Sequence, residues 1–169
     1  MSEKEIESAG TTLCKSCGLC CSGHLFAWVK LRSPELVPLE SLGVNVIHEP
    51  RQRGFSLPCP LWNGQCTIHE SSHYPRACKT YKCKLLKQVL EETVTLTEAL
   101  TVVQNAKEMT QEVELLLSSS SNNNFRERLV AYIEQRNADL FFQIKAAKLL
   151  AFYKDFFGVR DLTDIVEES

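Results

Sequence analysis

The pattern of apolar and polar positions divides the 169-residue chain into two unlike parts. Up to about residue 92 the apolar runs are short and are broken by Cys, Gly and Pro, a pattern typical of short strands and loops. Beyond that point apolar residues recur at helical spacing over long segments. We therefore predict an α+β protein: a small cysteine-rich, metal-stapled head with short strands and a hairpin, followed by a mainly α-helical C-terminal half.

Within the head, strand formers at residues 25–31 predict a short strand, and alternation at residues 44–47 suggests a second one. Ser33 as cap and Pro34 at the first helical position predict a helix that Gly43 ends. Residues 49–54 are expected to form a loop. Asn63-Gly64 between two apolar runs is a strong hairpin signal. This hairpin would bring the cysteines at 59 and 66 to its two sides, close enough to share a site.

In the C-terminal half, Thr95 and Glu98 form a capping-box pattern that begins a helix. Seven consecutive Ser and Asn residues at 118–124 indicate a linker, and its last residue, Asn124, caps the next helix. The segment at 137–139 either breaks the helical pattern or bends it. The predicted helices cover residues 96–117, 125 to about 136, and 140–157, the last ending at Gly158.

These patterns divide the chain into three regions. Residues 1–11 are polar and expected to be disordered, residues 12–92 form a cysteine cluster domain, and residues 93–169 form a helical extension that closes with an acidic tail at 161–169. A protein partner or a second copy of the chain is expected to dock on the helical half.

Composition narrows the function classes. A net charge of −2 gives no overall nucleic-acid or membrane footprint, so neither partner is expected. The N-terminal residues carry acids and no apolar core of a signal peptide, and no run approaches the roughly 18 apolar residues of a membrane span. A cytoplasmic location is therefore expected, where thiols are kept reduced and cysteines serve as ligands or redox groups.

The cysteines carry the chemistry. Four of them follow the pattern Cys-x-x-Cys-x-x-Cys-Cys at residues 14–21, too dense for a core, and a disulfide scaffold is disfavoured because adjacent cysteines do not easily pair. We predict that they bind metal as thiolates together with the cysteines farther along the chain. The predicted ligands are Cys14, Cys17, Cys20, Cys21, Cys59, Cys66, Cys78 and Cys83.

Two ligand patterns overlap at the first of these residues. Cys14 to Gly18 has the form of a zinc knuckle, in which a tight turn points N–H groups at the sulfurs. Cys14, Cys17 and Cys20 with the remote Cys59-Pro60 instead match the three-plus-one ligands of a four-iron cluster. We slightly favour the iron–sulfur cluster of the 4Fe–4S type, with Zn²⁺ as the alternative.

The number of centres stays open at this point. Cys20 and Cys21 are adjacent, so their side chains diverge, and Cys21 has no assigned role. Cys78 and Cys83 would point roughly 140° apart on one helix, so either a helix begins after Cys83 or the two thiols serve different centres. Eight cysteines could supply two four-thiolate centres, or one cluster plus a redox pair.

Residues near the cysteines add to the candidates. Five cations without an intervening acid would lower thiol pKa values and screen a negatively charged centre. His69, three residues after Cys66, is the best candidate among the histidines for a further ligand, and the aromatic residues could seal the centre from water. The cations are Arg76, Lys79, Lys82, Lys84 and Lys87; the other histidines are His24, His48 and His73; the aromatic residues are Trp28, Trp62, Tyr74 and Tyr81.

Several enzyme signatures are absent from the sequence. It contains no dinucleotide-binding glycine motif, no phosphate-binding loop, no metalloprotease His-Glu-x-x-His and no nucleophile elbow. The Cys-x-x-x-Cys-x-x-Cys spacing of radical adenosylmethionine enzymes is also missing. Whether the chain is an enzyme is therefore left open.

Residues 14–83 resemble the CxxCxxCC, or YkgJ-type, cysteine cluster family of zinc- or iron-chelating proteins. The motifs that carry the resemblance are Cys14-x-x-Cys17-Gly18-x-Cys20-Cys21, Cys59-Pro60-Leu61, Gly64-x-Cys66-x-Ile68 and Tyr74-Pro75-Arg76-x-Cys78-x-x-Tyr81. The family usually has Arg-Pro where this chain has Pro75-Arg76.

The resemblance implies metal chelation. A related enzyme, flagellin lysine N-methylase, transfers methyl groups from S-adenosylmethionine to protein lysines and is associated with an iron–sulfur cluster. The resemblance thus leaves two alternatives beside a metal-chelating protein: a protein-lysine methyltransferase, although the helical half shows no methyl-donor motif, and a structural zinc module for protein–protein interaction.

Overall fold

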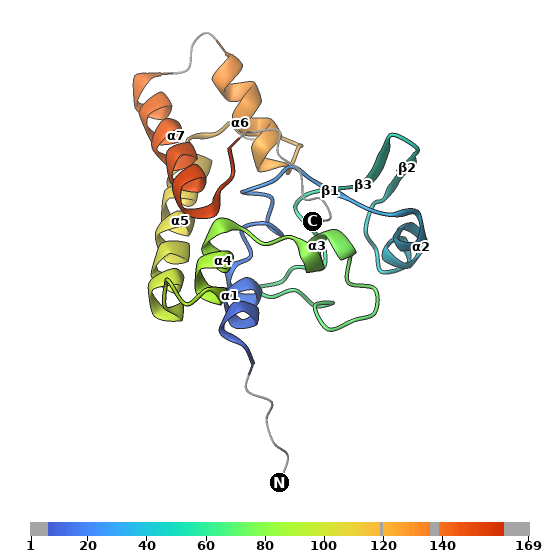
Figure 1. Ribbon diagram of the computed structural model, residues 1–169. Helices are drawn as coiled ribbons and strands as arrows, with labels where there is room; N and C mark the ends of the chain where they lie inside the picture. Colours follow the sequence, from blue (N-terminus) through green and yellow to red (C-terminus); the bar gives the residue numbers. More distant parts are fainter. Residues whose placement is uncertain (1–6, 119, 136–138, 161–169) are drawn as a thin grey trace.

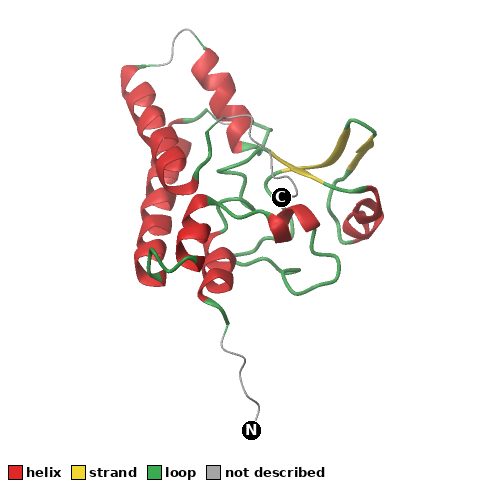
Figure 2. Cartoon of the chain, viewed as in Figure 1, coloured by secondary structure: helices red, strands yellow, loops and turns green. Residues whose placement is uncertain are grey.

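The computed structural model describes residues 7–118, 120–135 and 139–160, and these confirm the α+β class, with strands in the N-terminal part and a helical C-terminal half (Figures 1 and 2). In chain order the described elements are α1 (Ala9–Cys17), β1 (Trp28–Lys30), α2 (Ser33–Ser41), β2 (Ile47–Glu49), β3 (Gln52–Ser56), α3 (Arg76–Thr80), α4 (Lys84–Leu90), α5 (Leu96–Leu116), α6 (Phe125–Glu134), α7 (Leu140–Phe152) and a π-helical turn, η1 (Tyr153–Phe157).

The sheet of the head has three antiparallel strands in the order β1-β3-β2. Trp28 pairs with Ser56 and Val29 with Phe55, so Val29 and Phe55 turn into the core together. The predicted loop at 49–54 is wrong, because β2 and β3 pair as a hairpin with Glu49 opposite Gln52. The second strand was predicted at 44–47, but β2 begins only at Ile47. Val44 and Val46, which precede it, are buried in the core and lie outside the strand.

The start of the chain also differs from the prediction. The N-terminal region was expected to be disordered as far as residue 11, but α1 begins at Ala9. The Ser8 side chain caps this helix by accepting a hydrogen bond from the backbone N–H of Thr11. Gly10 and Leu13 are buried, so α1 is held by packing as well as by its cap.

The helical half follows the predicted signals closely. Thr95 and Glu98 form the capping box of α5, and Asn124 caps α6. Asp139 caps α7, so the pattern is broken between two helices rather than bent. Gly158, in the left-handed region at φ 75°, ends the turn η1 that continues α7. The predicted end of α6 at residue 136 and the acidic tail at 161–169 lie outside the described residues.

The core connects the two parts of the chain. Helices α1 and α4 of the head pack on α5, and α7 also packs on α5 (Figure 1). Asn124, nearly fully buried, donates from its side chain to the carbonyl of Ala27 (2.8 Å), which ties the start of α6 to the sheet. None of the helices in the described part of the chain is both long and apolar enough to cross a bilayer.

Candidate metal centre

The first four cysteines lie at the end of α1 and in the turn that follows. Cys14 and Cys17 occupy the last turns of the helix, and Gly18 ends it in the left-handed region at φ 67°. A side chain at position 18 would overlap the indole ring of Trp62, so only glycine permits both the turn and this contact. The zinc-knuckle prediction of a turn at Cys14–Gly18 is therefore wrong for its first residues, which are helical.

The other four cysteines reach the same place from two segments. Cys59 donates its backbone N–H to the carbonyl of Cys21 (2.7 Å), which holds these two segments of the chain side by side. In place of the predicted hairpin the chain forms a tight turn with one isolated antiparallel β-bridge. This bridge pairs Cys66 with Trp62 and not with Cys59. No regular strands form there because several polar groups in the turn bond within it, as Asn63 does with Gln65.

The helix expected to run through Cys78 and Cys83 is interrupted between them. Cys78 lies in the short helix α3, and the chain is extended at Tyr81. Cys83 is the cap of α4, where its sulfur accepts a hydrogen bond from the backbone N–H of Leu86 (3.4 Å). A helix thus begins after Cys83, as one of the two predicted alternatives required.

The eight thiols surround two small neighbouring cavities with apolar walls. The first, of about 80 Å³, has Cys59, Cys66 and Cys78 on one side, and the second, of about 60 Å³, has Cys17 and Cys83. Tyr81 lines both cavities, which share three thiols: Cys14, Cys20 and Cys21.

Electrostatic interactions among the thiols fall into two overlapping sets, with Cys14 acting on members of both. The charges that act on Cys20 come first from Cys17 and Cys83, and those that act on Cys21 come first from Cys78 and Cys59. Adjacent cysteines therefore face different neighbours. We call the two sets the α1 group, which comprises Cys14, Cys17, Cys20 and Cys83, and the loop group, which comprises Cys21, Cys59, Cys66 and Cys78.

Burial is the largest cause of a raised pKa at seven of these thiols: Cys14, Cys17, Cys20, Cys21, Cys59, Cys78 and Cys83. It raises the pKa of Cys17 to about 12 and raises the pKa of Cys20 well above the ordinary value. Among the predicted basic residues, Lys87 lowers the pKa of Cys83, but burial outweighs it and the pKa of that thiol is raised overall. Lys87 thus acts on Cys83 in the predicted direction, but the effect of burial is larger.

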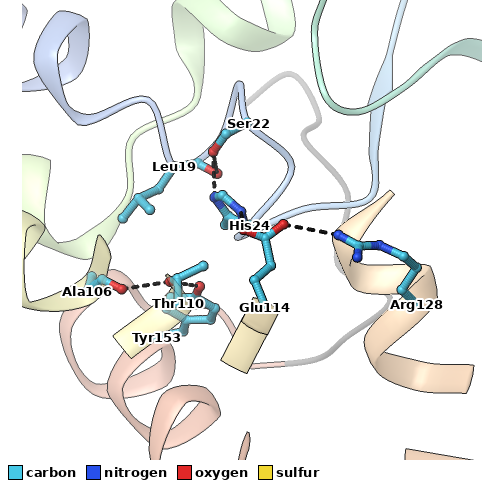
Figure 3. Close-up of polar contacts among 8 residues, drawn as sticks. All are labelled: Leu19, Ser22, His24, Ala106, Thr110, Glu114, Arg128 and Tyr153. Atoms are coloured by element: carbon cyan, nitrogen blue, oxygen red, sulfur yellow. Dashed lines mark hydrogen bonds and ion pairs between the residues drawn. The ribbon is translucent and has the colours of Figure 1, made fainter. Parts of the chain in front are cut away.

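The candidate histidines lie outside the two cavities. The ring of His69 packs on the ring of Tyr74, with centroids 5.0 Å apart, and His48 pairs with Glu40 (3.2 Å). His24 contacts Ser22 and Glu114 instead of a sulfur (Figure 3). The backbone of His73 donates to Ser71.

The spacing of the side chains bears on the kind of metal. Across the described residues, no three Cys, His, Asp or Glu side chains converge as a group able to hold a single metal ion. Four thiolates around one zinc would stand about 3.8 Å apart, given Zn–S bonds of about 2.3 Å. A single zinc ion would therefore require thiols of the two cavities to move closer together.

Comparison with known proteins finds no match: no family model, no curated protein and no solved structure is similar to this chain. The site must therefore be interpreted from its own geometry.

Proposed function

We propose that the protein is a metal-chelating cysteine cluster protein with two thiolate-bound centres, one held by the α1 group and one by the loop group. The observation that carries this proposal is that all eight thiols line two adjoining cavities, while the adjacent Cys20 and Cys21 have different thiols as their strongest electrostatic neighbours. Eight unpaired thiols gathered around two cavities have no evident role in packing, because apolar side chains would fill the same space without the cavities.

Iron–sulfur clusters fit the site better than single zinc ions. The apolar walls of the two cavities support this choice, since the exclusion of water tunes the potential of such a cluster. When bound, a cluster would supply electron transfer. The protein's own residues would supply the ligands and the dry surroundings, with Tyr81 between the two centres.

A cytoplasmic location and membership of the CxxCxxCC family belong to the same proposal. Eight unpaired cysteines remain reduced in the cytosol, where they are available to metal. Docking of a protein partner or a second copy on the helical half is also proposed, supported by Leu140 and Phe141, which are 71% and 59% exposed at the start of α7.

Anaerobic metal analysis with a visible spectrum tests the proposal. Two four-iron clusters would give about eight iron and about eight sulfide per chain, with a broad absorption band at about 400 nm. About two zinc ions without a visible band would favour the structural zinc module. Less than about one equivalent of either metal would contradict the proposal.

Single substitutions test the division into two groups. Cys83→Ser is expected to remove one centre and Cys78→Ser the other, so each lowers the metal content by about half, and the double variant abolishes it. Ser71→Ala, in the same region of the chain, is the matched control and should retain all metal. Loss of all metal in both single variants would show one shared centre instead. Saturable binding of S-adenosylmethionine, measured by calorimetry, would favour the methyltransferase alternative.

A further inference from the structure

A third and larger cavity adjoins one of the two thiol cavities. It is an open cleft of about 440 Å³ between the turn after α1 and the exposed side of α5. Its walls combine one aromatic side chain with several polar ones, a combination typical of small-molecule sites. The polar residues include Ser22, His24, Lys107, Gln111 and Glu114, and the aromatic residue is Trp62.

Three side chains in this cleft form a continuous relay (Figure 3). The hydroxyl oxygen of Ser22 lies 2.7 Å from Nδ1 of His24. On the opposite side of the ring, Nε2 lies 3.5 Å from a carboxylate oxygen of Glu114. Serine, imidazole and carboxylate thus stand in the order required of a nucleophile, a general base and a group that orients the base.

Two residues that do not line the cleft, Arg128 and Phe125, hold the relay side chains in place. Arg128 of α6 donates to the other carboxylate oxygen of Glu114 (3.0 Å), and the ring of Phe125 meets the His24 ring edge-on, with centroids 5.0 Å apart. The hydrogen bond from His24 holds the pKa of Glu114 below its ordinary value despite partial burial, so the carboxylate is ionised. An ionised Glu114 favours the tautomer with hydrogen on Nε2, which leaves Nδ1 free to accept the serine proton.

The cleft also offers hydrogen-bond donors for a substrate. The ammonium group of Lys107 donates one hydrogen bond to the carbonyl of Ser16 (3.0 Å), and such a group has three N–H donors. Gln111 contributes an exposed side-chain amide on the same face of α5. These groups can stabilise negative charge that develops on a carbonyl oxygen.

We propose that Ser22 and His24 are the nucleophile and general base of a site that hydrolyses small carboxylic esters in this cleft. Glu114 and Arg128 are positioning residues, and Trp62 forms an apolar wall for the acyl group. This activity is independent of the proposed metal centres, although Cys17 borders both the cleft and one thiol cavity.

The reaction balances with water as the sole co-reactant. Ser22 Oγ attacks the ester carbonyl carbon while its proton moves to Nδ1 of His24. The carbon–oxygen bond to the alcohol breaks, and the alcohol leaves with that proton. Water then attacks the acyl-serine, gives one proton to His24, and the acid departs as Ser22 recovers its proton.

A fluorophosphonate probe tests the proposal on the protein as purified, with its metal content measured on the same sample. We expect phosphonylation of Ser22, located by peptide mass spectrometry, and hydrolysis of p-nitrophenyl acetate. Ser22→Ala should abolish both, His24→Gln should lower the labelling rate by about 10²-fold or more, and Glu114→Gln should lower it less. Ser71→Ala is the control and should behave as the unsubstituted protein.

Two results would overturn the proposal. One is an unlabelled Ser22 in protein that is folded by circular dichroism. The other is a His24→Gln variant that lowers the melting temperature yet labels at the unchanged rate, which would make the relay a structural contact only. Labelling of Ser22 in protein without metal would retain this proposal while contradicting the proposed metal centres.

Discussion

The head and the helical half solve the problem of a stable interior in different ways. In the helical half, α5, α6 and α7 bring apolar side chains together, and Leu129, Phe142 and Leu149 are fully or almost fully buried. A buried hydroxyl there is paired, since Thr110 contacts Ala106 and Tyr153. In the head the strands are only three to five residues long, and the middle of the segment is occupied by cavities edged with thiols.

The difference shows where stability comes from in each part. Long amphipathic helices bury enough apolar surface to be stable through packing. The head also buries apolar side chains, such as Leu19, Leu25 and Leu39, but its thiol-lined cavities leave part of its interior unfilled. The free energy of folding of the head should therefore depend on what fills the cavities. The experiments below perturb first one part and then the other.

Removal of metal should have the largest effect and should be confined to the head. Metal ligation contributes on the order of 10 kcal/mol to the folding of small thiolate sites, so an anaerobic chelator should unfold the loops that carry the loop group. Hydrogen exchange measured by mass spectrometry should then show loss of protection from Leu57 to Cys83 and continued protection in α5 and α7. Equal loss of protection in both parts would contradict the comparison.

A cavity in the helical half should have an intermediate effect. Leu129 is fully buried, so Leu129→Ala should lower the free energy of unfolding by about 3 kcal/mol through lost contacts and the space left behind. Urea unfolding with metal bound measures the change. Ile133→Ala, on the same helix but 42% exposed, is the control and should cost less than about 1 kcal/mol. A metal content below that of the unsubstituted protein would show that the head relies on this packing.

The smallest effect is expected for a clamp within the head. Burial alone would raise the pKa of Glu35, but its carboxylate accepts hydrogen bonds from the backbone N–H groups of Arg32 and Arg76, both at 2.8 Å, and these lower the pKa overall. Glu35→Gln should therefore cost about 1 kcal/mol near pH 7, measured by thermal unfolding. The exposed Glu40→Gln should cost less.

The pH dependence of the same clamp follows from the sign of the shift. Because the pKa of Glu35 is lower in the folded protein, its stabilisation is fully present above the unfolded pKa and is lost as the pH falls through the folded value. The difference between Glu35→Gln and the unsubstituted protein should thus be constant from about pH 6 to 8 and disappear in acid. A difference that grows in acid would rule out the clamp.

Local signals in the sequence predicted the helical half well. Thr95 with Glu98, and Asn124, act through side chains that reach backbone groups two or three residues away, so their effect is visible without knowledge of the fold. Gly158 likewise ends its helix through its own backbone freedom. The sheet was predicted less well, because Arg53 and Gly54 are paired only through contact with β1 and β2.

The relay at Ser22 illustrates what sequence reasoning missed. His24 was considered only as a neighbour of sulfur, and Glu114 was simply one position of a predicted helix. They are 90 residues apart in the chain, and no local pattern links them. Packing of α5 against the turn after α1 brings them together.

The sequence by itself determined the fold class, the helix boundaries set by caps, and the eight candidate ligands, because these depend on residue type and short spacing. It also indicated that Cys20 and Cys21, as neighbours, could not easily serve one ion. Only the tertiary structure decided which distant thiols each of them faces. That choice depends on how the turn after α1 meets the segments around Cys59, Cys78 and Cys83, and such meetings between remote segments are decided by packing of the whole core.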